Sequence, residues 1–75
     1  MHSEYVKGIV LRPLMDAGYT AWRGGERLGI AHLVEGEIEV SAEDPRVRAL
    51  LVERLEADAR AAGIPLRAVA LPVAA

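Results

Sequence analysis

Apolar and polar residues alternate along residues 37–42, and this is the clearest local pattern in the chain. The apolar positions are Ile38 and Val40, and the polar positions around them are Glu37, Glu39 and Ser41. Successive side chains of a strand point to opposite faces, so the pattern predicts a β-strand with one apolar face and one acidic face.

The apolar spacing becomes helical in residues 45–62. Residues three and four positions apart form one stripe, made of Val47, Leu50, Leu51, Leu55, Ala59 and Ala62. Asp44 is a favourable N-cap, and Pro45 suits the first helical position, where its missing N–H costs nothing. Gly63 suits a left-handed C-terminal cap, and Pro65 prevents continuation. We therefore predict an amphipathic helix that buries the stripe.

Two short turn signals divide the middle of the chain. Gly24-Gly25 separates Tyr19–Arg23 from Glu26–Val34, and two glycines suit a two-residue turn that needs positive φ. Glu35-Gly36 then separates the second segment from Glu37–Ala42. Three strands joined by two hairpin turns predict a meander.

The N-terminal segment is ambiguous. Helical spacing predicts a helix over Glu4–Ala17 with Ser3 as its cap, although Pro13 should kink or interrupt it. The alternative is a strand over Tyr5–Leu11, which is rich in β-branched residues, followed by a short helix that Pro13 opens. We favour the helix, because Asp16-Ala17-Gly18 is typical of a helix end.

The C-terminal segment, Leu66–Val73, predicts a last short strand, and Pro72 places it at an edge or a strand end. The predicted order is α-β-β-β-α-β. It describes an α+β fold, with a small antiparallel meander sheet of three to four strands and two helices on one face. Residues 1–75 are expected to form a single small domain.

Two-residue turns also predict which strand residues face each other. Trp22 lies opposite Arg27, Ala21 opposite Leu28, and His32 opposite Glu39. The core face then carries Trp22, Gly29, Ala31, Leu33, Ile38 and Val40. The other face carries Tyr19, Ala21, Leu28, Ile30, His32, Glu37, Glu39 and Ser41.

The second of these faces should meet water, yet it contains Tyr19, Leu28 and Ile30. A β-bulge near Gly29 would turn Leu28 inward. Alternatively, a second copy or another partner covers the face. We favour the second copy, because the core is expected to be thin.

Composition is the reason to expect a thin core. The chain has 75 residues, of which 52% are hydrophobic but only 4% are aromatic. A domain of this size has a narrow margin of stability, and the absence of Cys excludes disulfides and thiolate metal sites. Small domains short of core often gain stability by forming oligomers, so we expect a homodimer.

The charge is slightly acidic, with a net charge of −2 and nine scattered basic residues. Free nucleic-acid binders usually show a basic excess or a basic stripe, which this chain lacks. The N-terminus has no long apolar run, so we expect no signal peptide and no membrane span. The absence of Cys fits a cytoplasmic protein.

Acidic residues gather around the predicted third strand, at Glu35, Glu37, Glu39, Glu43 and Asp44. Their spacing is not that of a calcium loop, and no zinc-type ligand spacing exists, so we expect no metal. They suit a docking surface for a basic protein partner. The expected partner-binding residues are Glu35, Glu37, Glu39, Glu43, Tyr19, Leu28, Ile30 and His32.

Few residues suggest catalysis. His32 opposite Glu39 could transfer a proton, but a half-exposed cross-strand pair is the simpler interpretation. No nucleophile stands at a useful spacing, His2 is expected to be inert, and Gly24-Gly25 does not match a phosphate-binding loop. We expect no enzyme and no cofactor.

Trp22, Arg23 and Arg27 could form an aromatic and basic patch that touches a nucleic-acid backbone. The simpler interpretation makes Trp22 the main aromatic side chain of the core. The order of helix, three-stranded meander and helix over about residues 3–62 resembles double-stranded-RNA-binding-like folds and small toxins of the HicA kind. This resemblance implies a nucleic-acid-binding or toxin-like module.

The sequence thus favours a non-catalytic protein-interaction module that forms a homodimer and offers an acidic strand to a basic partner. A nucleic-acid-binding module is the alternative, and a small hydrolase that uses His32 ranks last.

Overall fold

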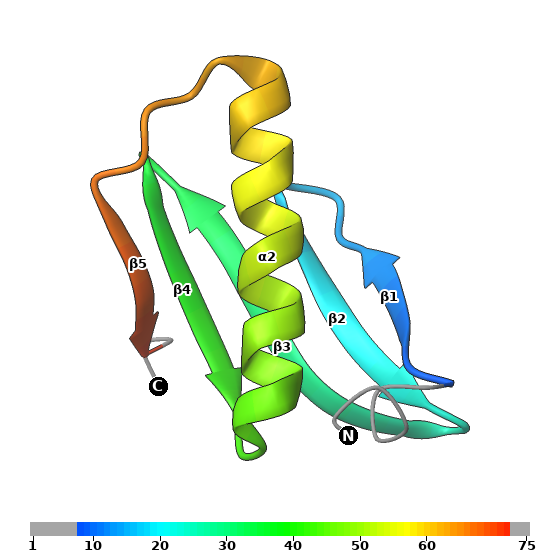
Figure 1. Cartoon of the computed structure of the whole chain (residues 1–75). Coiled ribbons are helices and arrows are strands. Elements are labelled where there is room, and N and C mark those ends of the chain that lie inside the picture. Colours follow the sequence, from blue (N-terminus) through cyan, green and yellow to red (C-terminus); the bar gives the residue numbers. More distant parts are fainter. Residues whose placement is uncertain (1–7, 73–75) are drawn as a thin grey trace.

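The computed structural model describes residues 8–72, and these residues form five strands and one helix. In chain order they are β1 (Val10–Pro13), β2 (Gly18–Arg23), β3 (Glu26–Val34), β4 (Glu37–Ala42), α2 (Pro45–Ala62) and β5 (Ala68–Pro72). The strands make one sheet in the order β1-β2-β3-β4-β5, and α2 lies across one face of it (Figure 1). The first four strands are antiparallel to their neighbours, and β5 runs parallel to β4.

Helix α2 confirms the predicted bounds and caps. Of the predicted stripe, Val47, Leu51, Leu55 and Ala59 are buried, whereas Leu50 is half-buried and Ala62 is exposed. The Asp44 side chain accepts a hydrogen bond from the backbone N–H of Arg46 at 2.8 Å. Gly63 adopts a left-handed conformation with φ of 72°, and the N–H of Ile64 returns to the carbonyl of Ala59 at 2.9 Å. Both caps therefore satisfy backbone groups that the helix ends would leave unpaired.

The predicted N-terminal helix is wrong for the described residues. Val10–Pro13 is strand β1, which pairs with β2, and residues 14–17 form the connection between the two. The β-branched Ile9 and Val10 favour a strand, and Pro13 is tolerated because it ends an edge strand. The short helix of the alternative interpretation does not form either. Residues 4–7, Ser3 and His2 lie outside the described residues.

This correction changes the architecture. Within residues 8–72 the order is β-β-β-β-α-β, so one helix rather than two covers the sheet. The resemblance to double-stranded-RNA-binding-like folds and HicA-type toxins needs a helix before the meander. The structure has β1 just before the meander, so that resemblance does not hold over the described residues.

The central meander is confirmed, with its turns at the predicted dipeptides. Gly24, Glu35 and Gly36 have φ of 60°, 52° and 81°, as turns between twisted antiparallel strands require. Trp22 lies opposite Arg27, and His32 lies opposite Glu39, as predicted.

A β-bulge in β3 overturns the predicted pairing of Ala21. Ala21 lies opposite Gly29 while Trp22 lies opposite Arg27, so Leu28 is an extra residue without a counterpart on β2. One extra residue reverses the alternation of side chains on one side of it. Leu28 consequently packs against the core.

The bulge also corrects the predicted faces of β2. Tyr19 and Ala21 lie on the face that α2 covers, and Ala21 is fully buried. Trp22 lies on the opposite face, so the prediction that it is the main core aromatic is wrong. The explanation of Leu28 by a bulge holds, and cover by a second copy is not needed for this residue.

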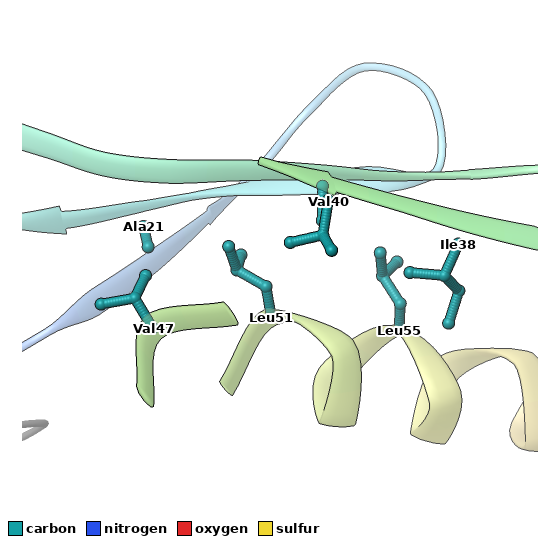
Figure 2. Packing of buried hydrophobic residues seen from close by; sticks show 7 residues of the cluster. Ala21, Ile38, Val40, Val47, Leu51 and Leu55 are labelled. Atoms are coloured by element: carbon teal, nitrogen blue, oxygen red, sulfur yellow. The ribbon is translucent and has the colours of Figure 1, made fainter. Parts of the chain in front are cut away.

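The core lies between α2 and the sheet. Val47, Leu51 and Leu55 point from the helix toward the strands, where they meet Ala21, Ala31, Ile38 and Val40 (Figure 2). Several of the strand residues are small, which lets the helix approach the sheet closely. The buried cluster contains no aromatic residue, in agreement with the thin core expected from composition.

Strand β5 confirms the last predicted element, with bounds Ala68–Pro72 instead of Leu66–Val73, and Val73 lies outside the described residues. The predicted antiparallel sheet of three to four strands is wrong in two respects, because the sheet has five strands and β5 runs parallel to β4. The carbonyl of Gly36 accepts the N–H of Arg67 at 2.7 Å. This bond attaches the segment that leads into β5 to the turn between β3 and β4.

The packing of α2 predicts a large loss of stability for Leu51→Ala. The substitution should lower the free energy of unfolding by about 2–5 kcal/mol, because it leaves a cavity under the sheet. Leu50→Ala is the matched control, since Leu50 is only half-buried and should lose clearly less. Urea unfolding followed by circular dichroism measures both, and equal losses would contradict this packing.

The close approach of helix and sheet predicts that Gly29→Ala is also destabilising. A Cβ at Gly29 would lie 2.8 Å from the Ala42 Cβ and 3.1 Å from the Leu51 Cδ1. We expect a loss of about 1–3 kcal/mol. Gly25→Ala is the control, because a Cβ there meets nothing within 4 Å. Thermal unfolding of both variants should separate them, and a fully stable Gly29→Ala variant would refute the contact.

Candidate functional site: the outer face of the sheet

The face of the sheet opposite α2, called the outer face below, is built from alternate residues of the four antiparallel strands. Cross-strand partners share a face, so the pairing assigns its members: Val10, Arg12, Gly18, Thr20, Trp22, Arg27, Ile30, His32, Val34, Glu37, Glu39 and Ser41. The only helix among residues 8–72 lies on the other side of the sheet (Figure 1). We take the outer face as the candidate site.

Trp22 contacts two neighbouring side chains, Thr20 and Arg12, at one end of this face. Its Nε1 donates a hydrogen bond to Thr20 Oγ1 at 2.8 Å, and the Arg12 guanidinium carbon lies 4.9 Å from the ring centroid. Thr20 is only 7% exposed although it belongs to the outer face, and its hydroxyl also donates to the backbone carbonyl of Arg12 at 3.5 Å. Trp22 thus presents an aromatic surface with a cation held above it.

The sequence did not identify Arg12 as a site residue. It pairs with Thr20 across β1 and β2, and this position brings it to Trp22. Arg27, the expected partner of Trp22, lies exposed across from it on the same face, and Arg23 lies at the exposed end of β2. Arg12 reaches Trp22 only because Val10–Pro13 is a strand. The helix predicted from the spacing of apolar residues gave no reason to place the two side chains together.

The five predicted acidic residues do not form one surface. Glu37 and Glu39 lie on the outer face, and the Glu37 carboxylate accepts a hydrogen bond from Arg67 Nη2 at 2.7 Å. Glu35 belongs to the turn before β4, and Glu43 follows β4 as an exposed residue. Asp44 caps α2 and forms an ion pair with Arg46.

Apolar side chains stand at three further positions of the outer face. Ile30 is half-buried at its centre, between Thr20 and Ser41. Val10 and Val34 are 54% and 47% exposed. The outer face therefore combines an aromatic and basic end, a mixed centre and an acidic end.

Two predicted partner-binding residues lie on the other side of the sheet. Leu28 packs into the core, and Tyr19 connects the sheet to α2. The Tyr19 hydroxyl donates a hydrogen bond to Asp58 at 2.5 Å and accepts one from Arg54 Nε at 3.2 Å. The Arg54 guanidinium also lies 4.9 Å from the Tyr19 ring centroid. These contacts hold the helix on the sheet.

His32 lies between two carboxylates. Glu39 is its cross-strand partner, and Asp16 Oδ2 lies 4.0 Å from His32 Nδ1. The Asp16 side chain is 75% exposed, so this contact lies largely in water. The surroundings of His32 fit a polar cross-strand position at the edge of the acidic end.

A groove of about 650 Å³ lies where β3 extends past the end of β4, next to the start of α2. Residues 26–30 and 41–45 form most of its walls. It carries exposed charges of both signs, from Glu26, Arg27 and Glu43. This mixture does not select one class of ligand, and the groove is not included in the candidate site.

Comparisons with protein-family models, with curated proteins and with solved structures give no match for this chain. Among residues 8–72, no three His, Asp or Glu residues lie close enough together to hold a metal ion. No helix in the same range is long and apolar enough to cross a membrane. The chemistry of the outer face is therefore the basis for the functional argument.

The stack on Trp22 predicts energetic coupling with Arg12 rather than with Arg27. A double-mutant cycle of Arg12→Met with Trp22→Leu should give about 0.5–1 kcal/mol, the usual size of an exposed cation–π contact. The matched cycle with Arg27→Met should give a value near zero. Both cycles are measured by urea unfolding at one fixed protein concentration. A larger coupling with Arg27 would contradict the described geometry.

Proposed function

We propose that this chain is a non-catalytic protein-interaction module that docks through the outer face of its sheet. The observation that supports it most is the asymmetry of the two faces. Helix α2 covers the inner face, whereas no helix or strand of residues 8–72 lies over the outer face, where Val34 is exposed and Trp22 and Ile30 are half-buried. Apolar side chains gathered on one uncovered face of a small domain are typical of a binding surface.

The charged residues on this face support a protein partner rather than a small molecule. Arg27 and Glu39 flank the half-buried Ile30 along the outer face, as charges do on the rims of protein interfaces. Rim charges guide association and select the orientation of the partner. The acidic strand β4 offers Glu39 to a basic group, while Glu37 is already bound by Arg67.

A nucleic-acid-binding module is the second candidate. It is favoured by the basic and aromatic end of the outer face, where Arg12 lies over Trp22 and Arg27 lies across from it. Nucleic-acid bases can stack on such a surface while arginines contact phosphates. Glu37 and Glu39 on the same face count against it, because they would repel a strand that continued across the sheet.

Photo-crosslinking inside cells tests the proposal. A photoreactive residue replaces Val34 on the outer face, and the control replaces Ala57, which is exposed on α2. We expect a sharp protein adduct from position 34 that the control lacks. Equal adducts from both positions, or none from position 34, would contradict the proposal. An adduct that nuclease removes would instead support the second candidate.

A further inference from the structure

The charges of the outer face are separated along the strands. Arg12 and Arg27 lie in the half near the Gly24-Gly25 turn, on either side of Trp22. Glu37 and Glu39 lie in the half near the Glu35-Gly36 turn. Asp16 adds a third carboxylate to that acidic half, where it lies next to His32.

The centre of the face joins these two halves. Ile30 lies in the row of Arg12 and Thr20, and His32 lies in the next row, with Gly18 and Glu39. These two β3 residues are both half-buried. A line drawn across the strands between them divides the basic half from the acidic half.

We propose that a second copy of this chain occupies the outer face, in a dimer whose two-fold axis follows that line. Rotation by 180° about it places the basic half of each copy on the acidic half of the other. The row of Trp22 and Arg27 then lies over the row of Val34 and Glu37 at the start of β4. Because Arg67 already binds Glu37, Arg27 meets Glu39, which lies one row further along β4. Arg12 faces Asp16. The same patch serves both copies, as a closed two-fold interface requires. This inference rests on the proposed function of the outer face.

The charge pattern favours a second copy over other occupants. A purely basic partner would match Glu39 but repel Arg27, and a polyanion such as nucleic acid would do the reverse. An occupant that satisfies both halves must carry both signs in the opposite order. A rotated copy of this chain has that order by symmetry.

The area of the outer face determines how tightly two copies are expected to associate. Four strands about 4.8 Å apart and the nine residues of β3 outline on the order of 400 Å². Standard protein interfaces bury about 800 Å² on each partner, so this dimer belongs to the weak class. We expect it to exchange with monomer at micromolar or higher concentration.

Charge reversal combined with mixing tests the inference. Sedimentation of the purified chain from micromolar to millimolar concentration should show growth from 8.1 kDa to twice that mass. Arg27→Glu alone, or Glu39→Arg alone, should weaken the dimer about tenfold or more, because two like-charge contacts form. Glu53→Arg on the exposed side of α2 is the matched control and should change nothing.

The decisive result comes from mixing the two single variants. In the mixed dimer, both contacts pair opposite charges again, so association should recover to nearly the original level. The Arg27→Glu, Glu39→Arg double variant should also recover alone, which excludes misfolding as the cause of the losses.

Three outcomes would overturn the inference: a chain that stays monomeric, a dimer that ignores the charge reversals, or single variants that do not rescue each other. A monomer whose position 34 still crosslinks to a different protein would overturn the second copy and leave the proposed function standing. A chain that stays monomeric and gives no protein adduct from position 34 would contradict both the second copy and the proposed function.

Discussion

The close contact of α2 with the small residues of the inner sheet face is the constraint on which the structure depends. Leu51 packs where β3 has Gly29, and a Cβ at that glycine would lie 3.1 Å from the Leu51 Cδ1. Ala21 and Ala31 complete this shallow surface, and both are fully buried. Trp22 lies on the outer face, and the bulge at Leu28 lets Ala21 pair with Gly29 while Trp22 pairs with Arg27. The composition of the outer face thus depends on how the inner face is packed.

Local signals were sufficient for the parts of the fold that local chemistry determines. Asp44, Pro45 and Gly63 define the ends of α2, and the two dipeptide turns define the register of β3 with β4. The bulge is different, because Leu28 and Gly29 offer two pairings that differ little in local geometry. Whether Leu28 or Gly29 pairs with Ala21 depends on which residue leaves room for Leu51. That contact is tertiary, so the local sequence pattern does not reveal it. The prediction of a helix over Val10–Pro13 was wrong for a related reason, since the strand conformation of this segment depends on its pairing with β2.

In the candidate site, too, local patterns predicted some positions, whereas others depend on tertiary contacts. Alternation on β3 and β4 placed Ile30, His32, Glu37 and Glu39 on one face, and the structure has them there. Tyr19 and Leu28 were assigned to the same face because the bulge was not included in the favoured register. Arg12 was missed because its contact with Trp22 exists only when β1 pairs with β2. The face that results has Trp22 and Val10 in place of Tyr19 and Leu28, and its charges are more clearly separated.

The accessibility of Trp22 tests the central claim most directly, because it is the single tryptophan of the chain. Iodide quenching of its fluorescence should be efficient in dilute protein, where the ring lies on the outer face beside the Arg12 cation. Quenching should decrease as protein concentration rises and the outer face becomes covered. Emission that resists iodide at every concentration would place Trp22 in the core and contradict the account.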